Sequence, residues 1–245
     1  MSDSLQTLIG LLDLTSLNPT DDNIKIQQLC QQAITPLGKV AAVCIYPQFV
    51  SEAQAILQGT DVKIATVSNF PEGNQPLAET LIEIEQALKA GADEIDLVMP
   101  YQAFLQGEYE AVQNFLATCK SACEQHTLKV ILETGALQSP EHIATASQIA
   151  IEAGADFLKT STGKLHEGAT LKAAEEMLRV IRTSDSEVGF KAAGGIRTIE
   201  QAQAYITLAQ DLLGEDWVEP YHFRLGTSQL LNEILQGNAQ FQYPD

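Results

Sequence analysis

Two lysines occupy positions at which a lysine is costly, inside short apolar segments that are typical of buried strands. Lys159 stands in the segment 157–160, and Lys191 ends an apolar run that begins at Val188. Burial disfavours the charged form of an amine and lowers its pKa. Proteins accept that cost mainly where an amine nucleophile is needed. Both side chains could instead extend to solvent, but two such lysines, each followed by a glycine-containing loop, favour chemistry.

The elements that must position these lysines alternate along the whole chain. Short apolar strands are predicted at 11–14, 40–46, 63–67, 94–99, 129–132, 157–160, 188–192 and 223–226. Helices are predicted at 4–10, from a cap at 19–22 to about residue 33, and at 48–57, 77–90, 109–125, 139–153, 170–182, 199–213 and 228–235. The motif AGAD occurs at 90–93 and again at 153–156, and each copy stands in one helix–turn–strand unit.

Uniformly apolar strands that are each followed by a helix are typical of an all-parallel sheet covered on both faces. With 245 residues, 45% of them hydrophobic, the chain can bury one large core. We therefore predict an α/β fold: a (β/α)8 TIM barrel with an extra N-terminal helix, as a single domain over residues 1–245. A doubly wound open sheet is the alternative, but no G-x-G-x-x-G motif follows the first strand.

In such a barrel the chemistry lies at the carboxyl ends of the strands. The side chains predicted there include Asp13, Thr15, Cys44, Asp96, Lys159 and Lys191. The two lysines fall on neighbouring strands, roughly 5 Å apart at the backbone. Two ammonium groups so close cannot both stay charged cheaply, so the pKa of one of them falls. A neutral amine near neutral pH is what attack on a carbonyl requires.

Glycine loops after the last strands indicate a phosphate site. Gly194 and Gly195 lead toward the next helix, and Gly226 and Ser228 precede the final one. Backbone N–H groups and a helix N-terminus bind phosphate at this place in many barrels. A Gly-Gly pair alone is usually just a turn, but Lys164 lies near these loops in the predicted barrel and favours an anion site.

Charge and composition narrow the class of protein. The formal net charge of −18 argues against a nucleic-acid partner. Five of the 14 basic residues fall in or beside strand-end loops of the second half, which favours a small anionic substrate: Lys159, Lys164, Lys191, Arg197 and Arg224. No apolar run approaches the roughly 18 residues of a transmembrane helix, and the N-terminus lacks signal-peptide features. The four cysteines and four histidines show no metal or redox spacing, so we expect a cytoplasmic protein without a metal or other cofactor.

Six motifs, in order and spanning nearly the whole chain, resemble those of one enzyme family. They are LDLT at 12–15, VCIYP at 43–47, NFPEG at 69–73, GADEID at 91–96, KTSTG at 159–163 and GFKAAGG at 189–195. The family is 2-deoxyribose-5-phosphate aldolase. The resemblance implies a class I aldolase that reversibly cleaves 2-deoxy-D-ribose 5-phosphate to D-glyceraldehyde 3-phosphate and acetaldehyde through a lysine Schiff base.

The resemblance also implies roles for individual residues. Lys159 corresponds to the Schiff-base lysine, Lys191 to the second lysine that makes this amine more acidic, and Asp96 to the carboxylate that moves protons with a water. The positions that match the family's phosphate loops are Gly163, Lys164, Gly194, Gly195, Arg197, Gly226 and Ser228. Some members end in a tyrosine that reaches the site, whereas here Tyr243 is followed by two more residues. A small phosphosugar is the expected partner, and the sequence is compatible with a homo-oligomer.

Several alternatives stay open at this point. Asp13 can be a hydrogen-bond partner of a catalytic group or a catalyst itself, and Asp96 can simply form a buried ion pair. Glu133 and Lys129 are interpreted as charge partners in the barrel interior. The Cys44 thiol is a candidate for attack on the unsaturated aldehyde that acetaldehyde forms by self-condensation. A different Schiff-base barrel enzyme and a non-catalytic phosphosugar-binding barrel are the competing functions.

Overall fold

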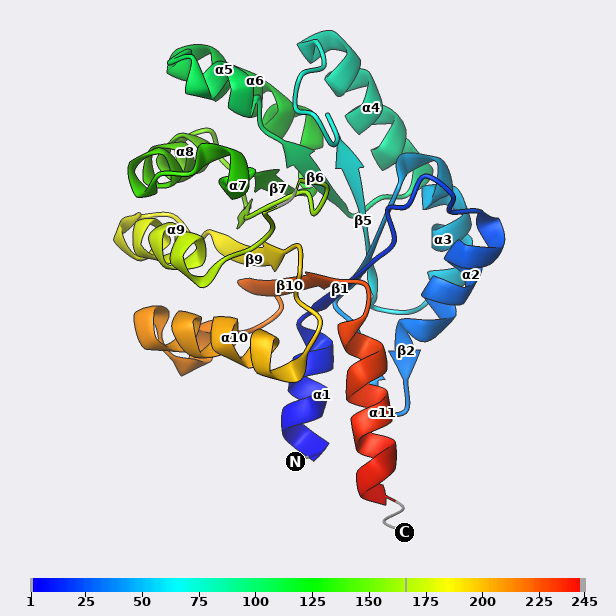
Figure 1. Cartoon of the computed structure of the whole chain (residues 1–245). Helices are drawn as coiled ribbons and strands as arrows, with labels where there is room; N and C mark the ends of the chain where they lie inside the picture. Colours follow the sequence, from blue (N-terminus) through cyan, green and yellow to red (C-terminus); the bar gives the residue numbers. More distant parts are fainter. Residues whose placement is uncertain (1, 166, 243–245) are drawn as a thin grey trace.

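The computed structural model describes residues 2–165 and 167–242, and in this part of the chain eight parallel strands close into a barrel (Figure 1). The strands follow one another around the barrel in sequence order, and β1 closes the ring against the last strand. They are β1 (Leu12–Thr15), β4 (Ala42–Ile45), β5 (Lys63–Ser68), β6 (Glu94–Val98), β7 (Thr127–Ile131), β8 (Phe157–Lys159), β9 (Gly189–Ala193) and β10 (Phe223–Thr227). The predicted (β/α)8 barrel is confirmed.

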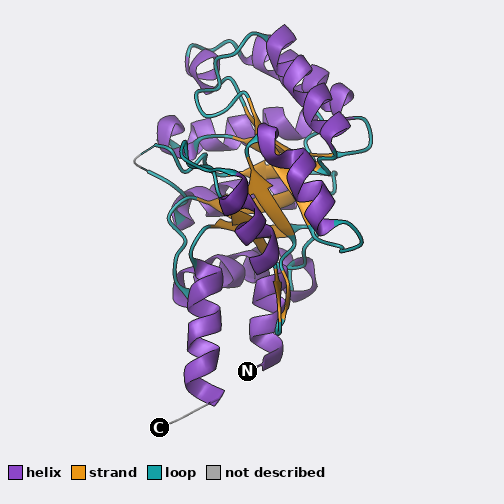
Figure 2. Ribbon diagram, turned by 90° about the vertical axis from the view of Figure 1, so that its right-hand side faces the viewer, coloured by secondary structure: helices purple, strands orange, loops and turns teal. Residues whose placement is uncertain are grey.

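Helices pack around the outside of the ring of strands (Figure 1), whereas the left side of the view in Figure 2 is taken up mainly by loops. The longer ones are α1 (Ser2–Gly10), α2 (Asn23–Gln32), α3 (Val50–Leu57), α4 (Leu77–Ala90), α6 (Tyr109–Cys123), α8 (Pro140–Glu152), α9 (Leu171–Thr183), α10 (Ile199–Leu213) and α11 (Leu230–Gln242). Both views show α1 and α11 projecting on the same side of the barrel, and α1 is the predicted extra N-terminal helix. Within the described residues, no helix is both long and apolar enough to cross a membrane.

Side-chain caps explain where several helices begin. The side chains of Asp22, Ser139 and Thr170 each accept a hydrogen bond from a backbone N–H in the first turn of α2, α8 and α9. At α10, Thr198 and Gln201 form a reciprocal capping box. These caps satisfy N–H groups that have no partner inside the helix, and α4 and α10 have the predicted bounds.

The structure also contains elements that the sequence pattern did not indicate. An antiparallel pair, β2 (Ile34–Thr35) with β3 (Gly38–Lys39), precedes the barrel strand β4, which therefore starts later than predicted. Short helical segments occur at α5 (Tyr101–Leu105), α7 (Thr134–Leu137), η1 (Pro47–Phe49) and η2 (Glu215–Trp217). The last helix begins at Leu230 because the Thr227 hydroxyl accepts hydrogen bonds from the N–H groups of Gln229 and Leu230.

The barrel interior is divided into an apolar half and a charged half. The inward residues of β4 and β5 are small and apolar, and they form a cluster with Leu17: Ala42, Cys44, Ala65 and Val67. Buried charged side chains come from β1, β6, β7, β8, β9 and β10: Asp13, Glu94, Asp96, Lys129, Lys159, Lys191 and Arg224. Because side chains alternate along a strand, a one-residue slip would turn these charges toward the apolar core under the helices.

Gly189 provides a test of how tightly this interior is packed. A Cβ at this position would lie 2.5 Å from the ring of Phe157, its register partner on β8. That ring lies 5.9 Å from Lys129 Nζ and 5.6 Å from Arg224 Cζ, measured to its centroid. We expect Gly189→Ala to lower the free energy of unfolding by about 1–3 kcal/mol in urea titrations, because overpacking displaces neighbours. Gly10→Ala is the control, since no atom lies within 4 Å of its Cβ position, and an equal loss in both variants would contradict the prediction.

Candidate active site

One carboxylate, Asp96 in the middle of β6, holds three lysines inside the barrel. Its Oδ2 atom accepts hydrogen bonds from Lys159 Nζ and Lys191 Nζ, both at 2.7 Å. Its Oδ1 atom accepts a hydrogen bond from Lys129 Nζ at 3.0 Å. Lys159 and Lys191 are direct register partners on β8 and β9, so the strand alternation brings the two lysines together as predicted. The carboxylate between them offsets the repulsion that two neighbouring ammonium groups would otherwise feel.

A second set of ion pairs lies behind this centre and fixes Lys191. Lys191 Nζ lies 2.5 Å from Asp13 Oδ2, on β1. Arg224 on β10 bridges Asp13 Oδ1 at 2.7 Å and Glu94 Oε1 at 2.9 Å. Glu94 in turn accepts a hydrogen bond from Lys129. All five of these side chains are buried, and each charge has an opposite charge beside it, as burial requires.

These contacts determine which lysine stays charged. Burial alone would lower the pKa of Lys191, but the Asp13 and Asp96 carboxylates outweigh it and raise that pKa above its ordinary value. Burial would raise the pKa of Asp96, but Lys129, Lys159 and Lys191 hold it well below its usual range. Lys191 is therefore an ammonium and Asp96 a carboxylate near neutral pH.

The charges of the interior are balanced without Lys159. Three carboxylates face three cations behind it: Asp13, Glu94 and Asp96 against Lys129, Lys191 and Arg224. Lys159 shares the Asp96 carboxylate with Lys129 and Lys191, and of these three lysines it is the one that also lines the cavity at the carboxyl ends of the strands. Its amine is therefore placed to act as a nucleophile on a bound molecule.

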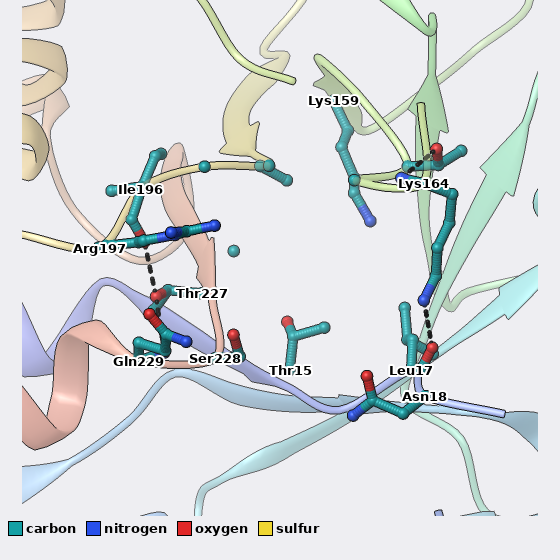
Figure 3. Close-up of a pocket in the computed structure, with 16 residues that line it drawn as sticks. Thr15, Leu17, Asn18, Lys159, Lys164, Ile196, Arg197, Thr227, Ser228 and Gln229 are labelled. Atoms are coloured by element: carbon teal, nitrogen blue, oxygen red, sulfur yellow. Dashed lines mark hydrogen bonds between the residues drawn. The ribbon is translucent and has the colours of Figure 1, made fainter. Parts of the chain in front are cut away.

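Above Lys159, at the carboxyl ends of the strands, lies an open cavity of about 250 Å³ (Figure 3). All seven positions predicted to bind phosphate line it: Gly163, Lys164, Gly194, Gly195, Arg197, Gly226 and Ser228. Thr15 and Lys159 line it as well. Figure 3 shows Lys159, from the end of β8, and Arg197, from the loop after β9, both entering the cavity, while Lys164 reaches across to the backbone oxygen of Leu17. The cavity therefore brings an amine together with two further cationic side chains.

Close backbone packing shapes this cavity. Gly194 has a φ of 94°, and a Cβ there would lie 3.0 Å from the Cα of Gly168 and 3.4 Å from the Cα of Gly163. At Gly168 a Cβ would lie 2.4 Å from the backbone oxygen of Gly194. The Ala169 N–H donates a 3.0 Å hydrogen bond to that same oxygen. Only glycine permits so close an approach of the loops after β8 and β9.

The prediction that all five of these basic residues lie in or beside strand-end loops was wrong for Arg224. Arg224 is the second residue of β10, and its guanidinium is held inside the barrel by Asp13 and Glu94, not in a strand-end loop. Lys191 is likewise enclosed by carboxylates. Among these five basic residues, Lys164 and Arg197 line the cavity and are not paired with a carboxylate of the described residues.

The secondary candidates lie at different depths. Asp13 belongs to the interior ion pairs, whereas Thr15 lines the cavity and donates a 2.9 Å hydrogen bond to the backbone oxygen of Asp13. Cys44 Sγ lies 3.8 Å from Asp96 Oδ2. Burial raises the pKa of this thiol. Cys44 thus faces the site but is disfavoured as a thiolate.

Some contacts were not foreseen. Lys129 is a charge partner in the barrel interior, as predicted, because it pairs with Glu94 and Asp96. Glu133 is not, because its carboxyl accepts its hydrogen bonds from Thr162. Glu94 was missed, although it stands two residues before Asp96 and strand alternation places both on one face. Nothing in the sequence singled out Leu17, because its contribution to the site is a backbone oxygen.

The remaining candidates can be placed only in part. Among the described residues, no group of three or more His, Cys, Asp or Glu side chains is arranged to hold a metal ion. His142 contacts the ring of Phe104, and His222 stacks on Trp217, both away from the cavity lining. Tyr243 and His166 lie outside the described residues.

The buried ion pairs predict an acid-sensitive free energy of unfolding. The pKa values of Asp13 and Asp96 are lowered in the folded state, so their contribution is present above the unfolded-state value of about pH 4 and is lost as the pH falls toward the folded values. We expect stability to decline below about pH 4, and Asp13→Asn to reduce the slope by up to about 1.4 kcal/mol per pH unit. Urea titrations at several pH values measure this. The exposed Asp185→Asn is the control, and a slope unchanged in Asp13→Asn would contradict the prediction.

Comparisons with known proteins agree with this geometry. Residues 7–232 match the family described as DeoC/LacD family aldolase. A Coccidioides immitis protein assigned as a deoxyribose-phosphate aldolase is similar, with 32% identity, a TM-score of 0.85, and coverage of 94% of this chain and 86% of that one. An aldolase called QR15 has 28% identity and a TM-score of 0.82, covering 97% and 99%. The tetrameric deoxyribose phosphate aldolase of Aeropyrum pernix has 25% identity and a TM-score of 0.77, covering 98% and 93%. The chain belongs to the DeoC/LacD family of aldolases.

Proposed function

We propose that this aldolase cleaves 2-deoxy-D-ribose 5-phosphate to D-glyceraldehyde 3-phosphate and acetaldehyde, with Lys159 as the Schiff-base nucleophile. The observation that carries the proposal is the position of the Lys159 amine. It stands between a charged carboxylate–lysine pair and an open cavity lined by glycine loops, Lys164 and Arg197. An amine so placed can attack a carbonyl while the loops hold an anionic group of the same molecule. The similarity to deoxyribose-phosphate aldolases supports the same substrate.

The reaction assigns one task to each group. The Lys159 amine adds to the aldehyde carbon C1, and loss of water gives an imine that draws electrons from the C2–C3 bond. Removal of the C3 hydroxyl proton breaks that bond, which releases D-glyceraldehyde 3-phosphate and leaves an enamine on Lys159. Protonation of the enamine at C2 and hydrolysis then return acetaldehyde and the free amine. Asp96, through a water, and Lys191 are the groups near enough to move these protons.

Two helix N-termini and two cationic side chains support a binding site for the substrate phosphate in this cavity. The N-termini of α10 and α11 lie behind the loops at 194–197 and 226–229, and a helix N-terminus favours an anion. Lys164 and Arg197 add two positive charges in a protein whose net charge is −18. A non-catalytic phosphosugar-binding barrel would account for these loops, but it has no use for an amine held against a charged pair.

Replacing Lys159 and replacing Lys191 are expected to impair Schiff-base formation in different ways. Lys159→Leu removes the only proposed imine-forming group, so borohydride should trap no substrate adduct at any pH. Lys191→Leu keeps that group but removes the adjacent positive charge and frees Asp13 and Asp96 to stabilise an ammonium at Lys159. Trapping should then be slow at neutral pH and should recover by about tenfold per pH unit as the pH is raised. The measurement is the trapping rate against pH, followed by peptide mass spectrometry.

Specific results would overturn these assignments. Trapping on Lys191 in the wild-type chain, or in Lys159→Leu, would exchange the roles of the two lysines. A Lys191→Leu variant that traps as fast as the wild type at neutral pH would show that Lys191 does not control the amine. A coupled assay for acetaldehyde release decides the substrate, and its loss in strong chelators with recovery by divalent ions would indicate a metal-dependent aldolase instead.

Cys44 gives a further prediction. High acetaldehyde should inactivate the enzyme through addition of this thiol to the unsaturated aldehyde that forms on self-condensation. Because burial raises the pKa of Cys44, we expect inactivation to be slow at neutral pH and faster as the pH rises. Mass spectrometry of the inactivated enzyme checks this, with Cys44→Ser as the resistant control. Inactivation that leaves the Cys44 peptide unmodified would contradict it.

Two broader expectations belong to the same proposal. The Aeropyrum pernix relative is tetrameric, which supports assembly of this chain with copies of itself. A cytoplasmic location is proposed because a phosphorylated sugar is the expected substrate. Light scattering and fractionation of cells would test the two expectations separately.

A further inference from the structure

Glu133, directly after β7, is a buried carboxyl that the proposed reaction does not use. Its backbone has φ 57° and ψ 61°, the left-handed region that side chains other than glycine rarely adopt. Its side chain is fully buried, and burial raises the pKa of the carboxyl, although hydrogen bonds from Thr162 oppose this. A strained backbone and a buried acid together cost stability, so the surrounding structure must hold this side chain where it is.

Within the described residues, the side-chain hydrogen bonds of Glu133 all lead to one turn of the cavity wall. The Thr162 N–H donates to both carboxyl oxygens, at 3.4 and 3.3 Å, and the Thr162 hydroxyl donates to Oε2. The same hydroxyl accepts a 3.1 Å hydrogen bond from the Lys164 N–H. Thr162, Gly163 and Lys164 line the cavity, whereas Glu133 is not among the lining residues. Glu133 therefore stands behind the turn and reaches the cavity only through Thr162.

We propose that Glu133 is a positioning residue for the phosphate end of the substrate: through Thr162 it holds the turn 162–164 so that Gly163 and Lys164 face the cavity. This inference rests on the proposed function and extends it to a residue that does not touch the substrate. The hydrogen bonds to Thr162 fix the backbone of the turn on the side away from the cavity. The other side of the turn lines the cavity, and the Lys164 ammonium, which donates one hydrogen bond to the Leu17 backbone oxygen, has two further N–H groups for an anion.

The alternative is that Glu133 acts on the amine. The positive charge of Lys159 is one of the influences that lower the pKa of Glu133, and Glu72 is one that raises it. A carboxylate that stabilised an ammonium at Lys159 would affect every substrate, phosphorylated or not. A carboxylate that holds the turn affects only substrates that carry a phosphate. The two roles are thus separable by the choice of substrate.

The experiment compares 2-deoxyribose 5-phosphate with 2-deoxyribose, and adds borohydride trapping of acetaldehyde, which has no phosphate. The variants are Glu133→Gln, Thr162→Val and Thr162→Ser. We expect Glu133→Gln and Thr162→Val to raise the KM for the phosphorylated substrate by about tenfold. For Glu133→Gln, kcat/KM for 2-deoxyribose and the acetaldehyde trapping rate should stay within about twofold of the wild type, and for Thr162→Val the loss should be larger on the phosphorylated substrate. Thr162→Ser keeps the hydroxyl, so its KM for the phosphorylated substrate should stay close to that of the wild type.

A matched control and a double variant sharpen the result. Glu83 also accepts hydrogen bonds from a loop, at Ser68 Oγ and the Asn69 N–H, 2.9 and 3.0 Å away, but its loop does not line the cavity. Glu83→Gln should therefore not separate the two substrates. Because Glu133 and Thr162 act as one unit, Glu133→Gln with Thr162→Val should raise the KM no more than either change alone.

Other outcomes would overturn the inference. An equal loss on both substrates and in acetaldehyde trapping would mean that Glu133 acts on Lys159. Unchanged kinetics on both substrates would mean that the turn needs no support from Glu133. If Glu133→Gln does not fold, the Thr162→Val and Thr162→Ser pair gives the same decision. A wild-type chain that forms no adduct with either sugar would instead overturn the proposed function, and this inference with it.

Discussion

The shared Oδ2 atom of Asp96 is the contact on which the rest of the site depends. One carboxylate oxygen cannot accept from both Lys159 and Lys191 unless β6, β8 and β9 present these side chains at the same depth. The parallel register of the barrel provides that depth, because Lys159 and Lys191 are paired directly. Burial would lower the pKa of Lys191, but the Asp13 and Asp96 carboxylates raise it above its ordinary value. The closed ring of strands thus holds the Lys159 amine against the Asp96–Lys191 pair and leaves it open to the cavity.

The division of the barrel interior follows from the same requirement. Long charged side chains from β1, β6, β7, β8, β9 and β10 need room, and the small residues of β4 and β5 leave it to them. Gly189 likewise makes space for the ring of Phe157 under the cluster. Charge pairing and volume therefore have to be satisfied together. Neither a fully apolar interior nor an unpaired charge would be compatible with this arrangement.

The pairing of the two lysines and the glycine loops could be predicted from the sequence, whereas the positions of the Arg224 and Glu133 side chains could not. Strand alternation was enough to bring Lys159 beside Lys191, and the glycine pair at 194–195 was enough to indicate the phosphate loops. The position of the Arg224 guanidinium inside the barrel could not be predicted, because the distance of a residue from a strand end in the sequence does not determine whether its side chain enters the barrel. Glu133 was misassigned because its partner depends on a left-handed backbone, a conformation that a glutamate seldom adopts.

The contact between Gly168 and Gly194 limits how this site can diversify. The two loops touch backbone to backbone, so a side chain on either one has to displace the other. Lineages that take up a different leaving group should therefore change both loops together or neither, and single insertions there should be rare. The buried ion pairs are formed instead by side chains of the strands. Changes in these two loops can therefore alter substrate specificity while the buried lysines and carboxylates stay the same.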